Sequence, residues 1–245
     1  MNFNKHLELN RGHAVFGASQ NAWLRYDEEK IIDRVNGLMA KNFGTEIHDF
    51  ARSQIELRIR SRSVKGLIDS LMTYIYRKYF DEESDRLSSY GEKLLNGISR
   101  IPRDIFATVQ SYINDCVGFY MTPEQKLCYD PIYFFGTADC ISFRDDELRI
   151  HDLKTGRIQA HMDQLMIYAA FFCLEYKVDP RKLKMIELRI YQNNEIVVHH
   201  PEIEEILEIM EKIKQSYTML TNVFEGEGNR HEPSDSRNAG SLNRK

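Results

Sequence analysis

The first half of the chain repeats apolar residues at intervals of three and four, which is the spacing of amphipathic helices. A first helix is predicted to begin with Ser19 as its N-cap, and a second extends from about Gly44 to Arg60. Two further helices are predicted at Val64 to Phe80 and at Ile101 to Phe119. We therefore expect a helical part over residues of about 18–120.

Beyond about residue 125 the pattern changes to short runs of β-branched and aromatic residues, which favour strands, with one long helical run between them. The expected strands are Tyr133–Phe143, Glu147–Leu153, Met185–Gln192 and Glu195–His199, and the expected helices are about Gln159–Lys177 and Pro201–Val223. Turn residues, Arg144 to Asp146 and Asn193-Asn194, join the strand pairs. The alternation predicts the α/β class, with a central mixed β-sheet flanked by helices.

The chain has 245 residues, 42% of them hydrophobic, which suits one sizeable core in a single domain over residues 1–225. Residues 226–245 are polar and almost without apolar side chains, so we expect a flexible tail there. The chain contains no run of about 18 apolar residues, and its N-terminus lacks the pattern of a signal peptide. These features predict a cytoplasmic protein that does not bind a membrane.

Charge and cysteine content narrow the possible classes of protein further. The formal net charge of −4 is unlike that of a protein that coats DNA, although a local basic groove would still allow DNA binding. The cysteines have no C-x-x-C spacing, which argues against zinc motifs and against a disulfide framework in a reducing compartment. We expect free thiols, most of them buried.

The most unusual chemistry lies in the first predicted hairpin. Asp152 and Lys154 are two residues apart on one strand and therefore share a face, and Asp139 lies on the partner strand. Two carboxylates on one patch of sheet repel each other unless a cation neutralises them, and hard oxygen ligands suit Mg²⁺ or Mn²⁺. The alternative explanation is a surface ion pair at the rim of the sheet.

Four motifs extend this pattern in sequence order: Gly44 to His48, Gly136 to Asp139, Asp152 to Lys154, and Gln164 to Tyr168. In this order and on these elements, they resemble the RecB-like branch of the PD-(D/E)XK nucleases, which includes Cas4-type and phage-encoded exonucleases. The resemblance implies a restriction-endonuclease-like core. Residues 125–225 would form its catalytic sheet and flanking helices, with the helical part as an N-terminal insertion. Ala138 and Asp139 replace the proline and first acid of the nominal motif, as is usual in this branch.

The resemblance also implies roles for individual residues. One or two Mg²⁺ or Mn²⁺ ions would be held by His48, Asp139, Asp152 and the main-chain carbonyl of Leu153. Lys154 would orient or deprotonate the attacking water, while Gln164 and Tyr168 would contact the scissile phosphate or an adjacent nucleotide. Glu46 is a further acid near His48, but helix geometry places it on a different face. The alternatives are ordinary polar roles for His48 and Gln164 and core packing for Tyr168.

Some relatives hold an iron–sulfur cluster, with one cysteine before the histidine motif and three after the glutamine–tyrosine helix. The four cysteines of this chain are Cys116, Cys128, Cys140 and Cys173. Because none precedes His48 and none follows Cys173, we expect no cluster.

A dense basic stretch follows the histidine motif and consists of Arg52, Arg58, Arg60, Arg62 and Lys65. Such a run suits a track for the DNA phosphate backbone that leads to the metal site. The alternative is a solvated helix face.

The resemblance to this family implies a metal-dependent deoxyribonuclease in a bacterial or phage-infected cell. The first hypothesis is an exonuclease that acts on single strands or DNA ends in recombination, replication or DNA processing, and the alternative within the fold is a flap or branch endonuclease. Alternatives of another class are a catalytically weak module that binds DNA or a recombination or replication partner, and a structural protein. The sequence leaves open the cleavage polarity, the choice between DNA and RNA, the oligomeric state and any need for a partner.

Overall fold

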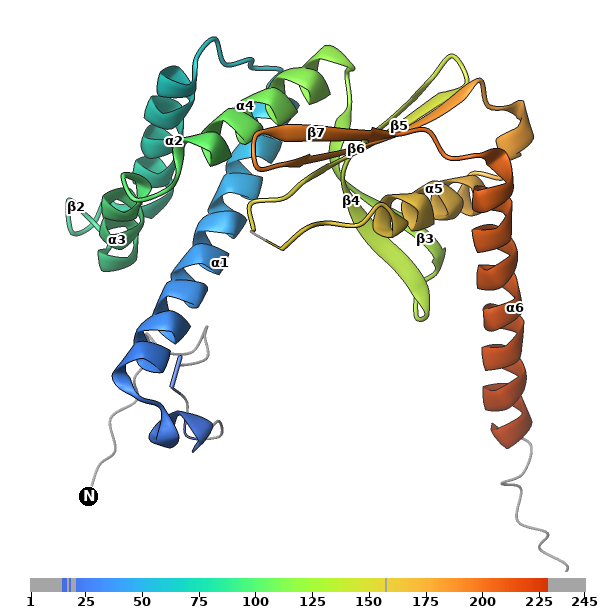
Figure 1. The fold of residues 1–245 in the computed structure, drawn as a ribbon, viewed down its shortest axis with the longest axis horizontal. Helices are drawn as coiled ribbons and strands as arrows, with labels where there is room; N and C mark the ends of the chain where they lie inside the picture. The colour runs from blue at the N-terminus through green and yellow to red at the C-terminus, as the bar shows by residue number, and fades with distance from the viewer. Residues whose placement is uncertain (1–14, 17, 19–20, 157, 229–245) are drawn as a thin grey trace, which may run out of the picture.

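The computed structural model of the chain describes residues 15–16, 18, 21–156 and 158–228. A five-stranded sheet lies between a group of four helices on one side and two helices on the other (Figure 1). The helices are α1 Glu28–Glu56, α2 Val64–Tyr79, α3 Ser89–Ile98, α4 Arg103–Gly118, α5 Asp163–Glu175 and α6 Ile203–Gly228. The strands of the central sheet are β3 Thr122–Asp130, β4 Phe134–Arg144, β5 Glu147–Leu153, β6 Met185–Gln192 and β7 Glu195–His199. The predicted α/β class with a mixed central sheet is confirmed.

The strands of the central sheet follow one another in sequence order, β3-β4-β5-β6-β7. β3, β4 and β5 form an antiparallel meander, β6 is parallel to β5, and β7 returns antiparallel to β6. Helix α5 makes the crossover that a parallel pair requires, and it packs on β3, β4, β5 and β6. Asp145, Asp146, Asn193 and Asn194 have φ between 52° and 64°, the left-handed conformation of tight hairpin turns.

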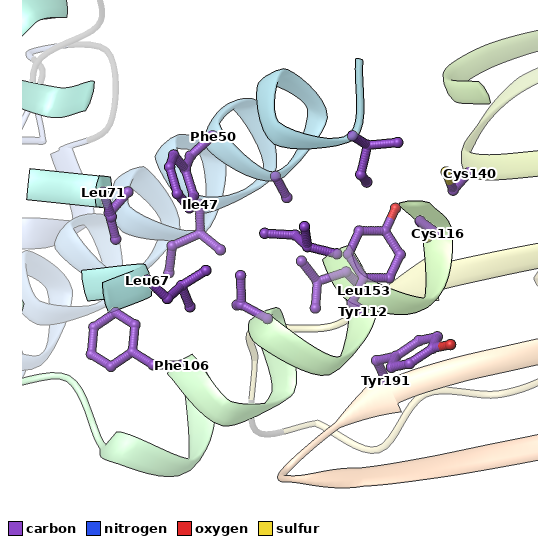
Figure 2. Close-up of a cluster of buried hydrophobic side chains, with 14 of the residues drawn as sticks. Ile47, Phe50, Leu67, Leu71, Phe106, Tyr112, Cys116, Cys140, Leu153 and Tyr191 are labelled. Carbon is purple, nitrogen blue, oxygen red and sulfur yellow. The ribbon is translucent and has the colours of Figure 1, made fainter. Parts of the chain in front are cut away.

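Two apolar clusters cover the two faces of this sheet. One joins the first four helices to Cys140, Leu153 and Tyr191 of the sheet, and Figure 2 shows Ile47 and Phe50 of α1 facing the other members. The second packs α5 and α6 on the opposite face. Cys116, Cys140 and Cys173 are buried and all four cysteines are free thiols, as expected.

The N-terminal helices differ from their prediction. A single helix, α1, replaces the two expected helices, and it begins after Asp27, whose side chain accepts a hydrogen bond from the Lys30 backbone N–H at 2.9 Å. The predicted cap, Ser19, lies outside the described residues. Gly44, the predicted start of the second helix, lies inside α1. A glycine there costs about 1 kcal/mol of helix propensity, which the buried side chains of Phe43 and Ile47 outweigh.

Five elements were not predicted, namely β3, α3, the short strands β1 Phe80–Asp81 and β2 Arg86–Leu87, and the 3-10 helix η3 Pro180–Lys182. β3 is polar and contains Pro123, which suits an edge strand but weakens the strand signal. At the other end of the chain, α6 includes residues 226–228, which the sequence assigned to the tail, and residues 229–245 lie outside the described residues. Within the described part of the chain, no helix combines the length and the apolar character that crossing a membrane requires.

Candidate metal centre at the fork between β4 and β5

The predicted acids meet where β4 and β5 separate. The ladder between these strands runs from Arg144 opposite Glu147 to Cys140 opposite His151. Beyond this pair, a side chain replaces the β4 backbone as the hydrogen-bond acceptor. The Oδ2 atom of Asp139 accepts a hydrogen bond from the Leu153 backbone N–H at 2.9 Å. The side chain of Asp139 is thereby held in the fork beside the end of β5.

Asp152 and Lys154 lie together at the end of β5, as the strand period predicted. The Lys154 Nζ lies 3.0 Å from both carboxylate oxygens of Asp152, but hydrogen-bonding geometry is met only at Oδ1. Asp152 is 2% exposed, and its Oδ2 is buried without a hydrogen bond among the described residues. An unsatisfied buried carboxylate oxygen has a free lone pair for a cation.

Gln164 and Tyr168 of α5 continue the same hydrogen-bonded chain. Lys154 Nζ donates to Gln164 Oε1 at 3.2 Å, and Gln164 Nε2 donates to the Tyr168 hydroxyl at 3.0 Å. Gly136 lies below this tyrosine, since a Cβ on it would lie 2.7 Å from the Tyr168 ring. The glycine of the Gly136 to Asp139 motif therefore makes room for the tyrosine of the Gln164 to Tyr168 motif.

Two residues on other elements complete the cluster. His48 projects from α1, with its Nδ1 3.6 Å from Asp139 Oδ2. Glu124 of β3 lies opposite Asp139, because the pairs on either side of it match Pro123 with Cys140 and Gln125 with Ala138. One ligand atom from each of His48, Glu124 and Asp139 lies within 4.8 Å of the other two. The structure thus adds Glu124 to the predicted ligands.

Glu124 is also held in an unusual conformation. Its φ is 50°, in the left-handed region that a non-glycine residue seldom adopts within a strand. Such strain costs on the order of 1–3 kcal/mol, and it persists where the surrounding structure fixes it, often at functional sites. The polar sequence of β3 gave no sign of this position, because it becomes apparent only once the register with β4 is known.

Burial and charge crowding shift the pKa values of this cluster. Burial, and then the negative charge of Asp152, raise the pKa of Asp139 to about 7, although the hydrogen bond from Leu153 opposes the shift. Burial also raises the pKa of Asp152, against the lowering effect of the Lys154 ammonium. For His48, burial lowers the pKa and so favours the neutral imidazole, which is the form that binds metals. The carboxylates of Asp139 and Asp152 are destabilised as anions in the absence of a cation. The carboxylates of Asp139 and Glu124, with the imidazole of His48, form a donor set that fits Mg²⁺ or Mn²⁺.

Glu46 does not belong to this cluster. It is buried on the α2 side of α1, where it accepts hydrogen bonds from the Tyr79 hydroxyl at 2.6 Å and from Lys78 Nζ at 2.9 Å. The same lysine pairs with Asp49 at 2.9 Å. Glu46 therefore anchors α1 to α2, as the helix geometry suggested, and is not available as a ligand.

Of the predicted basic track, only one residue lies at the candidate metal centre, and the other four lie elsewhere. Arg52 lines a cleft of about 880 Å³ together with His48, Glu124 and Asp139, and this cleft is called the metal cleft below. Arg58 instead donates to the Met121 carbonyl at 2.9 Å, and Arg60 packs against Gly118. Arg62 and Lys65 are exposed around the start of α2 and do not line the cleft. Lys41 and Lys126, which were not among the predicted residues, line it with Arg52.

Replacing Glu124 with glutamine should weaken Mn²⁺ binding roughly 10-fold or more, because a neutral amide replaces one anionic ligand. Isothermal titration calorimetry of the purified protein measures this change. Glu195→Gln, at an exposed position in β7, is the matched control and should bind Mn²⁺ like the unmodified protein. Equal affinity in the Glu124 variant would remove this residue from the ligand set.

The fold and this cluster define an α/β protein that carries a candidate divalent-metal centre at the fork of its mixed sheet. The family model described as "Protein of unknown function (DUF2800)" matches residues 20–231, and the chain belongs to this family. The match includes the whole central sheet and every residue of the candidate centre. Neither a curated protein nor a solved structure matches the chain.

Proposed function

We propose that the protein is a divalent-metal-dependent nuclease of the PD-(D/E)XK type, which hydrolyses phosphodiester bonds in DNA. The observation that carries the proposal is the convergence of His48, Asp139, Asp152 and Lys154 at one fork of the sheet, from three separate segments of the chain. A structural ion pair would need only Asp152 and Lys154. It would not need a second, half-buried carboxylate and an imidazole from helix α1 at the same place.

The topology supports the same proposal. The two acids lie on adjacent antiparallel strands, β4 and β5, and a crossover helix leads from β5 to the parallel strand β6. This order of elements suits the restriction-endonuclease-like core that the four sequence motifs imply. The crossover helix, α5, also supplies Gln164 and Tyr168 to the same hydrogen-bonded chain.

The ligands that we propose are His48, Asp139, Asp152 and Glu124, together with the Leu153 carbonyl. A bound Mg²⁺ or Mn²⁺ would supply Lewis acidity, which generates a hydroxide nucleophile at neutral pH and neutralises charge on the phosphate. Asp139 keeps its place through the Leu153 N–H, so its carboxylate is positioned before any ligand arrives.

Lys154 has the position of a group that orients the attacking water. Its ammonium has three N–H bonds, of which Asp152 and Gln164 accept two, so that one remains for a water or a phosphate oxygen. Because the Tyr168 hydroxyl accepts a hydrogen bond from Gln164, its own O–H is available as a donor to a phosphate or a neighbouring nucleotide. The charge of Lys154 stabilises negative charge that develops on the phosphate during attack.

The charge of the metal cleft supports a polyanionic substrate. Lys41, Arg52 and Lys126 line this cleft, although the chain as a whole has a formal net charge of −4. A local cluster of cations beside the acids would hold the phosphates that flank the scissile bond. We therefore propose DNA, as single strands or ends, as the substrate, and recombination, replication or DNA processing as the setting.

The purified protein should degrade labelled DNA in the presence of Mn²⁺ or Mg²⁺ and should leave it intact in EDTA. Oligonucleotides labelled at the 5′ or the 3′ end, single-stranded and double-stranded, reveal the polarity of cleavage from the order in which label is released. A matching RNA oligonucleotide tests the choice of nucleic acid. Absence of cleavage on all of these substrates with either ion would contradict the proposal.

A further inference from the structure

A second cavity lies directly beside the metal cleft. It has a volume of about 830 Å³, within the range of about 300–1,000 Å³ that is typical of small-molecule sites. Ala40, Gly44, Thr155 and Gly156 line both this cavity and the metal cleft. The two hollows therefore meet across one short boundary, formed by α1 on one side and the segment after β5 on the other. This second hollow is called the side cavity below.

The walls and the rim of the side cavity differ in character. Met39, Phe43, Ile101 and Ile105 form apolar walls, and the apolar part of the lining predominates. Lys93 and Arg100 contribute two positive charges against the single negative charge of Asp33, and all three side chains are exposed. Neither of them has an acidic partner within 4 Å in the described part of the chain. An apolar hollow with unpaired cations suits a ligand that combines a flat ring with a phosphate.

The face of α1 that borders the side cavity is built from small residues. Gly37, Ala40 and Gly44 follow one another at intervals of three and four, so they lie on one side of the helix. A Cβ on Gly37 would meet no atom within 4 Å, whereas a Cβ on Gly44 would lie 3.0 Å from Thr155 Oγ1. Two glycines inside a helix are unfavourable for helix stability. Because they have no side chains, they leave the cavity open at Gly37 and leave little material between the cavity and the metal cleft at Gly44.

We propose that the side cavity receives the terminal nucleotide of a DNA strand, whose adjoining phosphodiester then lies in the metal cleft. This inference rests on the proposed nuclease function. The base contacts the apolar walls, while Lys93 and Arg100 bind a terminal phosphate or another phosphate near the end of the strand. Because the side cavity accommodates only the end of a strand, cleavage in the metal cleft releases terminal nucleotides. The protein is then an exonuclease.

A pair of variants at Gly37 separates the cavity from the fold. Gly37→Leu places a large side chain in the hollow, at a position where nothing obstructs it and where leucine is the better helix former. Gly37→Ala has the same benefit for the helix and leaves most of the volume open. Thermal unfolding should show that both variants are at least as stable as the unmodified protein.

The probe is thymidine 5′-monophosphate, titrated by calorimetry in EDTA, with inorganic phosphate as the comparison. We expect Gly37→Leu to weaken binding of the nucleotide at least 10-fold and Gly37→Ala to leave it within 2-fold, and we expect phosphate alone to bind at least 10-fold more weakly than the nucleotide. In a second assay with Mn²⁺, Gly37→Leu should slow release of nucleotides from a linear strand to a similar degree. Arg100→Ala should also weaken nucleotide binding, while Arg77→Ala on the exposed side of α2 should not.

The two assays separate this inference from the nuclease proposal. Nucleotide binding that Gly37→Leu leaves unchanged would overturn the side cavity as a nucleotide site, even if DNA is degraded. The unmodified protein and its variants could all fail to degrade DNA, while the unmodified protein binds the nucleotide and Gly37→Leu does not. In that case the nuclease proposal is wrong and the nucleotide site is supported. Equal binding of phosphate and nucleotide would also count against the inference, because the apolar walls would then contribute nothing.

Discussion

Replacing Lys154 with alanine should lower the rate of DNA cleavage on the order of 10³-fold, the usual effect of removing a group that positions water and stabilises transition-state charge. The lysine is fixed by Asp152 at 3.0 Å and by Gln164 at 3.2 Å, so its ammonium is held in one place beside the acids. Single-turnover cleavage of a labelled strand with saturating Mn²⁺ measures the effect on the chemical step.

The same substitution should not abolish metal binding. Removal of a positive charge 3.0 Å from Asp152 leaves this buried carboxylate without its partner, so it should bind a cation at least as well as before. We expect Mn²⁺ to raise the melting temperature of Lys154→Ala by at least as much as it raises that of the unmodified protein. Lys212→Ala, on the exposed face of α6, is the matched control and should cleave normally. Full activity in Lys154→Ala would show that another group positions the water.

The hairpins of the sheet were predictable because their signals are local. β4 and β5 combine β-branched residues with the turn at Asp145-Asp146, and β6 and β7 do the same around Asn193-Asn194. β3 carries no such signal, since an edge strand needs little apolar surface and tolerates Pro123. The continuous α1 was missed for the opposite reason: Gly44 suggested a break, but the tertiary packing of the helix outweighs the propensity of a single glycine.

The candidate site shows the same division between local and tertiary information. Asp152 with Lys154, and Gln164 with Tyr168, could be paired because strand and helix periods place them on common faces. Glu124 could not be found, because its position depends on a strand register that the sequence does not reveal. Of the five residues of the predicted basic track, only Arg52 lines the metal cleft, for a related reason. α1 ends at Glu56, and Arg58 adopts a φ of 56°, so the arginines beyond this point turn away from the cleft.

Asp139→Asn should stabilise the metal-free protein while removing most of its stabilisation by Mn²⁺. Burial and the charge of Asp152 raise the pKa of the Asp139 carboxyl to about 7, so its anion is less favourable in the folded protein than in the unfolded chain. Asparagine has the same shape, its amide oxygen can still accept the Leu153 N–H, and it carries no charge. The gain should be on the order of 2 kcal/mol, because partial solvent contact reduces the full electrostatic effect, or ~4–8 °C in melting temperature.

The pH dependence of this difference follows from linkage. Between the unfolded pKa near 3.8 and the folded value of about 7, the folded protein binds more protons at Asp139 than the unfolded chain does. The unmodified protein therefore recovers stability as the pH falls through this window. The advantage of Asp139→Asn should be largest above pH 7 and should shrink towards pH 4, as measured by differential scanning calorimetry in EDTA. Asp145→Asn, in the exposed hairpin turn, should show neither effect. If Asp139→Asn instead lowers the melting temperature at pH 8, the carboxylate stabilises the fork between β4 and β5. That result would contradict the view that it is a destabilised anion positioned to bind a metal.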